Sequence, residues 1–169
     1  MKRCLILGII VFFNQLSIAT IVSYELTALG GSSFEYVYTI ENDSLGVPIE
    51  QFTIWFDELL YDNLQITTQL PLANDWDEII LPTTGFGVPL GYDALALTGG
   101  IGIGQTVGGF SISFGWLGSG LPGNQMYEIV NPANNQTIDS SSTVPEPTAV
   151  ILLGIGSLML NAKSQKRRG

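Results

Sequence analysis

The sequence contains no histidine, and it has no lysine or arginine anywhere between Cys4 and Ala162. The six basic residues of this 169-residue chain all lie at its two ends: Lys2, Arg3, Lys163, Lys166, Arg167 and Arg168. The interior therefore has no cationic groove for the phosphates of a nucleic acid, and we expect no nucleic-acid partner. It also has no imidazole to bind a metal, no internal salt bridge, and neither lysine nor histidine for acid–base chemistry.

Cysteine is almost absent as well, because Cys4 is the single one in the chain. A chain without disulfides depends on its hydrophobic core for stability. The missing histidine and lysine also exclude a Ser–His–Asp triad and a Ser–Lys dyad from the interior. We therefore expect no enzyme. The remaining catalytic alternative is a glycosidase that works through two of the 15 aspartates and glutamates, all of which lie between Glu25 and Glu146.

The first 19 residues have the pattern of a secretory signal peptide. Lys2 and Arg3 precede an unbroken apolar run over residues 4–13, and the small residues Ser17 and Ala19 give a cleavage pattern. Ten apolar residues are too few for a comfortable transmembrane span. We predict a signal peptide over residues 1–19 that the secretion machinery recognises, with a retained membrane anchor as the alternative. Cleavage would also remove the only cysteine.

The C-terminal end has four parts. Residues 134–143 are a polar, serine-rich stretch that predicts a linker, and a Val-Pro-Glu-Pro segment follows it. Residues 148–162 are apolar almost throughout and predict a transmembrane helix. Fifteen helical residues span about 22 Å, against a hydrocarbon core of about 30 Å, so the span is marginal and suits a transient anchor. The basic residues after it place the C-terminus in the cytoplasm and the acidic middle outside.

These C-terminal features together resemble the PEP-CTERM sorting signal of Gram-negative bacteria. The matching positions are Val144, Pro145, Glu146 and Pro147, the apolar span 148–162, and the basic stop formed by Lys163, Lys166, Arg167 and Arg168. The resemblance implies an exosortase-type membrane enzyme that recognises residues 144–169 and processes the chain. It implies transient anchoring in the inner membrane, then display at the cell surface or release, often in organisms that make exopolysaccharide. An ordinary tail anchor with a proline-rich lead-in is the alternative.

Residues 20–133 alternate between apolar and polar side chains with period 2, which indicates half-buried strands. The clearest strands are expected over residues 34–40, 52–56 and 110–116, and weaker ones over 21–29, 63–69, 76–81, 92–98 and 125–130. Turn-forming residues separate them, and no long 3.6-residue period appears. We predict a mainly β domain of seven to nine strands, an antiparallel β-sandwich of jelly-roll or immunoglobulin-like type.

Two further patterns in this region have structural interpretations. The Phe-x-Ile-x-Phe pattern of residues 52–56 recurs at residues 110–114. We interpret it as two core strands of similar composition rather than as a true repeat. The glycine-rich run Gly99–Gly104 lacks the spacing and the lysine of a phosphate-binding loop, so we expect a connection between strands.

Two kinds of ligand site remain open. Asp75, Asp77 and Glu78 form the densest group of oxygen ligands and are a candidate Ca²⁺ site, with a solvated turn as the other interpretation. The aromatic side chains that could stack on a sugar are Trp55, Trp76, Trp116, Tyr24, Tyr61, Tyr92 and Tyr127. Of these we favour Trp55 and Trp76. Trp55 alternates out of phase with its apolar neighbours and should point to the opposite face of its strand.

The leading hypothesis is thus an exported β-sandwich that has a structural or adhesive role at the cell surface or in the extracellular matrix. It needs no cofactor. Its partners would be the processing enzyme and the exopolysaccharide of the matrix. A carbohydrate- or calcium-binding module is the alternative, and a carboxylate-only glycosidase comes third.

Overall fold

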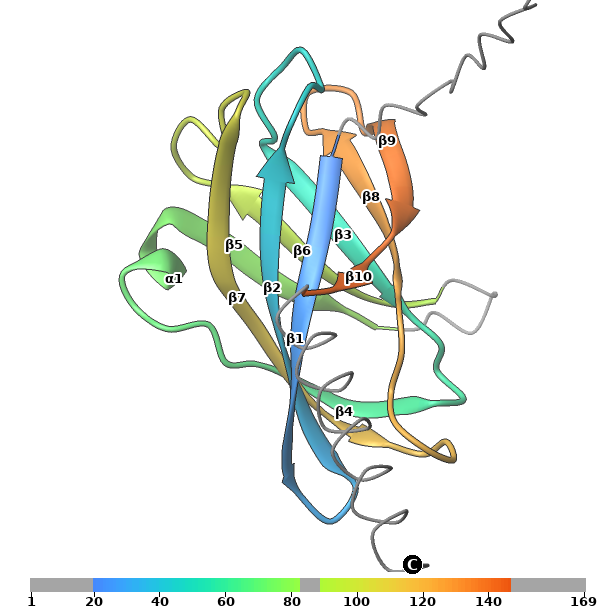
Figure 1. The fold of residues 1–169 in the computed structure, drawn as a ribbon. Helices are drawn as coiled ribbons and strands as arrows, with labels where there is room; N and C mark the ends of the chain where they lie inside the picture. Colours follow the sequence, from blue (N-terminus) through green and yellow to red (C-terminus); the bar gives the residue numbers. More distant parts are fainter. Residues whose placement is uncertain (1–19, 83–88, 147–169) are drawn as a thin grey trace, which may run out of the picture.

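The computed structural model describes residues 20–82 and 89–146, which form two packed β-sheets (Figure 1). The predicted signal peptide, the predicted transmembrane helix over residues 148–162 and the basic tail lie outside these ranges. Within them, no helix has the length and apolar character needed to cross a membrane. The signal peptide and the transmembrane helix therefore stay predictions.

The first sheet has the strand order β10-β1-β2-β7-β4, and the second has the order β5-β6-β3-β8-β9. The strands of the first sheet are β1 (Thr20–Gly30), β2 (Ser33–Asn42), β4 (Tyr61–Ile66), β7 (Gln105–Trp116) and β10 (Val144–Pro145). Those of the second are β3 (Gln51–Phe56), β5 (Trp76–Leu81), β6 (Leu90–Ala96), β8 (Met126–Asn131) and β9 (Gln136–Ser142). A single-turn helix, α1 (Leu72–Asp75), precedes β5.

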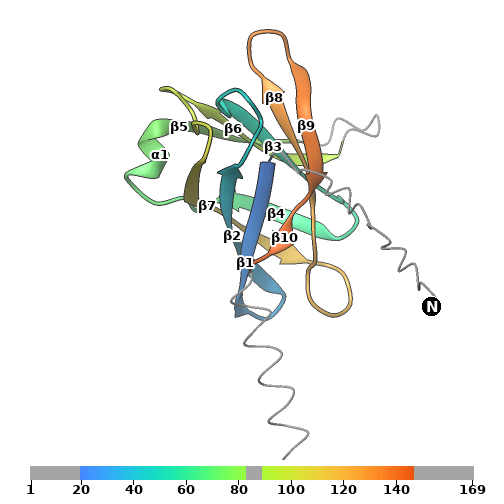
Figure 2. The ribbon, with the colours of Figure 1, turned by 45° about the horizontal axis from the view of Figure 1, so that its top comes forward.

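Paired strands in both sheets run antiparallel, except that β10 lies parallel to β1. The two sheets lie face to face, and their layers are seen from a second direction in Figure 2. This arrangement confirms the predicted mainly β, antiparallel sandwich. Successive strands often lie in different sheets, since β2, β3 and β4 alternate between the two. Residues far apart in sequence therefore meet at the ends of the sandwich.

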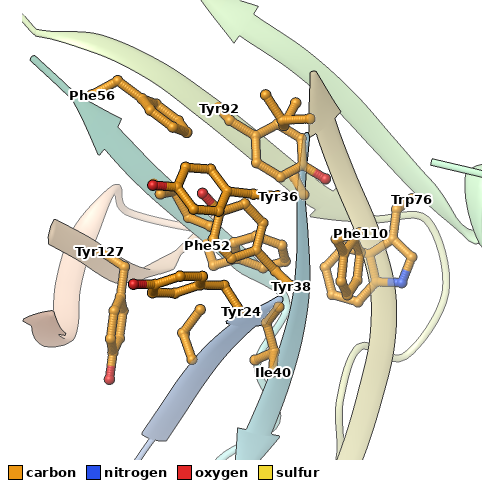
Figure 3. Packing of buried hydrophobic residues seen from close by; sticks show 14 of the residues in the cluster. Tyr24, Tyr36, Tyr38, Ile40, Phe52, Phe56, Trp76, Tyr92, Phe110 and Tyr127 are labelled. Atoms are coloured by element: carbon orange, nitrogen blue, oxygen red, sulfur yellow. The ribbon is translucent and has the colours of Figure 1, made fainter. Parts of the chain in front are cut away.

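The core lies between the sheets and is rich in aromatic rings (Figure 3). On β2 the alternation that the sequence shows places Tyr36, Tyr38 and Ile40 inward, where they are fully buried. From the opposite sheet, the Phe52 ring on β3 lies 5.0 Å from the Phe110 ring on β7, centroid to centroid, in an edge-to-face contact. Such contacts between large rings contribute more than their buried area alone.

The contact between Phe52 and Phe110 also bears out the interpretation of the repeated Phe-x-Ile-x-Phe pattern. The two copies are core strands of opposite sheets, and each buries its phenylalanines and its isoleucine. The glycine-rich run Gly99–Gly104 connects β6 to β7, as expected. Gly100 has φ +64°, and a Cβ there would lie 2.2 Å from the Ile49 carbonyl oxygen, so this close approach of two backbones requires glycine.

The prediction of a linker over residues 134–143 was wrong. Most of that segment is β9, which pairs with β8 and adds an edge to the second sheet. Its serine-rich side chains are mostly exposed, so the strand lacks the apolar face that makes alternation visible in a sequence. Two residues of the predicted sorting segment, Val144 and Pro145, form β10 and also belong to the sandwich. The folded domain therefore runs from Thr20 to Pro145 rather than ending near residue 133.

Candidate functional site

Trp55 lies on the outer face of the second sheet, as its sequence phase predicts. It sits on β3 opposite Gly91 of β6 on one side and Met126 of β8 on the other. A Cβ at Gly91 would lie 2.8 Å from the Cζ3 atom of the indole, so the ring rests directly on the backbone of β6. Trp55 is half-buried, which leaves part of its apolar ring available to a ligand.

Next to this indole is a pocket of about 410 Å³. Its lining comes from the end of β3, the start of β4, the end of β7 and the start of β8: Trp55, Asp57, Leu60, Tyr61, Trp116, Gly123, Asn124, Gln125 and Met126. Its volume lies within the range of small-molecule sites, and its lining combines aromatic with polar side chains. The pocket contains two of the three tryptophans in the chain.

Trp116 forms the second aromatic wall and is held by its own loop. Its indole Nε1 donates a hydrogen bond of 3.1 Å to the Gly120 carbonyl oxygen. Its ring lies 4.9 Å from the Tyr61 ring, centroid to centroid, in an edge-to-face contact. The Leu117 amide donates to the Leu60 carbonyl oxygen at 2.9 Å, which ties the loop after β7 to the start of β4. The ring is therefore fixed before any ligand arrives.

The third wall is the segment before β8, and buried Gln125 holds it in place. The side-chain amide of Gln125 donates to the hydroxyl oxygens of Tyr36 at 2.7 Å and of Tyr61 at 3.0 Å. Its carbonyl oxygen accepts hydrogen bonds from Tyr38 at 3.0 Å and from Thr143 at 3.3 Å. The side chain of Gln125 thus links the two sheets and has no hydrogen-bonding capacity left for a ligand.

Two further hydrogen bonds from tyrosine hydroxyls fix the same segment. Tyr36 donates to the Gly123 carbonyl oxygen at 2.7 Å, and Tyr24 donates to the Asn124 Oδ1 atom at 3.0 Å. Burial raises the pKa of Tyr24, Tyr36 and Tyr38 above the ordinary value for tyrosine, so these hydroxyls remain protonated donors at a pH where an exposed tyrosine ionises.

Polar capacity for a ligand remains on three residues of the pocket: Asp57, Asn124 and Trp55, whose indole nitrogen has no hydrogen-bond partner among the described residues. Asp57 is exposed just after β3, and its Oδ1 atom accepts a hydrogen bond from the Leu59 amide at 2.9 Å. The second carboxylate oxygen is left to accept a donor from a ligand. Exposed Asn124 uses its Oδ1 atom with Tyr24, so its amide nitrogen is left to donate. The side chains of the pocket therefore offer aromatic walls, one carboxylate acceptor and two donors, the Asn124 amide and the Trp55 indole nitrogen.

The aromatic side chains named from the sequence separate into two groups. Trp76 was wrongly chosen as a sugar platform, because it is 6% exposed and packs edge-to-face on Phe110 in the core. Trp76 is the first residue of β5, and its ring points into the core. Tyr24, Tyr61, Tyr92 and Tyr127 are also buried. Trp55 and Trp116 remain half-buried at the surface.

The proposed calcium ligands do not converge. Asp75 ends α1, while Asp77 and Glu78 are neighbours on β5 and so point to opposite faces. The Glu78 carboxylate accepts hydrogen bonds from Thr68, at 2.6 Å, and from the Tyr92 hydroxyl. Over residues 20–82 and 89–146, no group of three or more acidic, cysteine or histidine side chains is arranged to hold a metal ion.

The start of the predicted sorting motif lies against the first sheet. The Glu146 amide donates to the Tyr24 carbonyl oxygen at 2.9 Å, and its Oε1 atom accepts from the Thr39 hydroxyl at 3.0 Å. These contacts continue the pairing of β10 with β1. Pro147 and the basic stop lie outside the described residues, as do Ser17 and Ala19 of the predicted cleavage site.

No family model and no curated protein matches the sequence. A protein from Nocardia farcinica with an immunoglobulin-like fold is 16% identical, with a TM-score of 0.48, over 74% of this chain and 98% of that one. A family 3b carbohydrate-binding module from Clostridium clariflavum is 12% identical, with a TM-score of 0.45, over 77% and 98% of the two chains. A GH20 exo-β-N-acetylglucosaminidase from Vibrio harveyi matches with 13% identity and a TM-score of 0.40 over 18% of its length and 76% of this chain. These similarities assign neither a family nor a function.

Proposed function

We propose that this domain binds a carbohydrate in the pocket between Trp55 and Trp116, and that it serves as the adhesive part of an exported surface or matrix protein. The observation that carries the proposal is the pairing of two fixed indoles with the Asp57 carboxylate and the Asn124 amide in one pocket. Aromatic rings offer an electron-rich face of large apolar area. The C–H faces of a pyranose ring match such walls, and its hydroxyls match the polar groups between them.

A binding role fits the pocket better than catalysis does. A glycosidase needs two carboxylates about 5–10 Å apart on either side of the scissile bond. Asp57 is the single carboxylate among the residues that line this pocket. The proposed role is therefore recognition, with exopolysaccharide of the surrounding matrix as the natural ligand.

Replacing Trp55 with alanine should weaken binding of a neutral cello-oligosaccharide by about tenfold or more, because central aromatic anchors dominate the energetics of such sites. Isothermal titration calorimetry on the purified full chain, kept in solution with mild detergent, measures the change. Ile79 is a matched control, since it is 45% exposed on β5 of the same sheet and does not line the pocket. Ile79→Ala should bind as the parent does. Equal affinity of the parent and of Trp55→Ala would refute the proposed site.

Delivery of the domain is the second part of the proposal. We propose that the signal peptide over residues 1–19 directs export and that an exosortase-type enzyme processes the chain at residues 144–169. Two basic ends and an interior without cations support this topology, since positive residues are retained on the cytoplasmic side.

Replacing Pro147 with alanine should reduce processing and surface display, because it disrupts the Pro-Glu-Pro motif. It leaves the pairing of β10 with β1 in place, whereas deleting residues 145–147 would also remove part of the folded domain. Immunoblots of membrane and released fractions measure the outcome in the native host. Pro132→Ala, in the turn between β8 and β9, is the matched control. Unchanged maturation of Pro147→Ala would argue against the sorting role.

A further inference from the structure

The polar groups of the pocket restrict the chemistry of its ligand. The Gln125 amide and the Tyr61 hydroxyl are already engaged with each other and with Tyr36. Among the described side chains that line the pocket, a ligand therefore finds three free groups: the outer oxygen of the Asp57 carboxylate, the amide nitrogen of Asn124 and the indole nitrogen of Trp55. The first is an anion that needs a donor, and a charged donor makes the stronger hydrogen bond.

The charge of the whole domain also favours a ligand with a positive charge. The described residues contain all 15 carboxylates of the chain and no lysine, arginine or histidine. A ligand with carboxylate, sulfate or phosphate groups would meet no cation on this surface and would be repelled by its field. A positively charged ligand would be attracted, and its binding would not require breaking an existing ion pair.

Resting on the proposed carbohydrate site, we propose that the pocket selects an amino sugar whose amine is protonated, such as a unit of a glucosamine polymer. The sugar ring lies between the indoles of Trp55 and Trp116. Its ammonium group donates to the Asp57 carboxylate, and a ring hydroxyl accepts from the Asn124 amide. Neutral sugars bind more weakly at the same place, and uronic acids are excluded.

Asp57 suits this role because of its position on the chain. It is the first residue after β3, two residues beyond Trp55, and both side chains line the same pocket. The Leu59 amide holds one of its oxygens, which orients the carboxylate at the mouth of the pocket. A lone carboxylate is a poor site for a divalent cation, which takes six or more oxygen ligands. It is sufficient for one ammonium group.

The test compares three oligosaccharides of equal length on the purified full chain: a glucosamine oligomer, a cello-oligosaccharide and an oligogalacturonate. Binding is measured by calorimetry at physiological ionic strength. The salt then screens the general attraction between the acidic domain and a cationic sugar beyond about 8 Å. We expect the glucosamine oligomer to bind about fivefold more tightly than the neutral one, and the galacturonate not to bind. In Asp57→Asn this preference should fall to less than about twofold while neutral binding persists.

Glu58→Gln is the matched control, because it removes the same charge from an adjacent exposed residue that does not line the pocket. It should retain the preference for the amino sugar. Equal binding of amino and neutral sugars, or an equal loss of preference in both variants, would overturn the selectivity and leave the carbohydrate site standing. Binding of the galacturonate would also overturn it. If none of the three sugars binds, the carbohydrate site fails together with its selectivity.

Discussion

Replacing Gln125 with alanine is expected to lower the free energy of unfolding by about 3–5 kcal/mol. The side chain is 3% exposed, and it accepts hydrogen bonds from Tyr38 and Thr143 while donating to Tyr36 and Tyr61. Alanine would leave these buried hydroxyls without their shared partner. Each unsatisfied buried group costs about 1–3 kcal/mol, although the hydroxyls could partly reorganise among themselves. Because domains of this size are stable by only about 5–15 kcal/mol, the loss would be a large part of the total.

Urea denaturation of the full chain, followed by tryptophan fluorescence, measures this effect. Gln65→Ala is the matched control, since Gln65 is exposed on β4, and its loss should change the free energy of unfolding by less than about 0.5 kcal/mol. If the two variants were equally stable, the tyrosine hydroxyls would not depend on Gln125. The same substitution should weaken sugar binding, because Gln125 lies between Asn124 and Met126 in the wall of the pocket.

The parts of the fold that the sequence predicted are those that bury one face. Residues 34–40 were expected to form a strand, and β2 contains all of them, because its apolar side chains alternate against the core. The strand β9 was missed for the opposite physical reason. It is an edge strand with a polar composition, and backbone pairing with β8 defines it rather than side-chain burial.

The site was predictable only in part. The phase of Trp55 against Phe52, Ile54 and Phe56 correctly placed its ring on the outer face of β3. Nothing in the sequence shows that Asn124, about 70 residues away, lies in the same pocket. That proximity depends on the order of strands in the two sheets, and the period of a strand carries no information about its neighbours. The choice of Trp76 failed because β5 begins at that residue and points its ring inward, and the sequence does not show which face of this strand is buried.

Above about pH 10 the domain is expected to unfold cooperatively, because its tyrosines resist ionisation while the domain is folded. All six tyrosines of the chain are buried. Burial raises the pKa of Tyr36, Tyr38 and Tyr92 well above 10, and burial with the nearby Asp139 raises the pKa of Tyr127 to about 12. The folded state therefore keeps protons that the unfolded chain loses near pH 10. The stabilisation is complete below that pH and is lost as the pH rises toward the pKa values of the folded state.

The measurement follows tyrosinate absorbance and far-ultraviolet circular dichroism during one alkaline titration of the full chain. Because ionisation is coupled to loss of the core, we expect both signals to change together in a single steep step above pH 10. Gln125→Ala should shift that step to lower pH. Tyrosine ionisation in the unfolded chain lowers the free energy of unfolding, and a less stable domain unfolds after a smaller loss. Gln65→Ala should leave it in place. A gradual rise in tyrosinate absorbance with an unchanged dichroism spectrum would instead mean that the hydroxyls ionise within the folded domain. In that case the hydrogen bonds around Gln125 would not keep the tyrosine hydroxyls protonated in the folded domain.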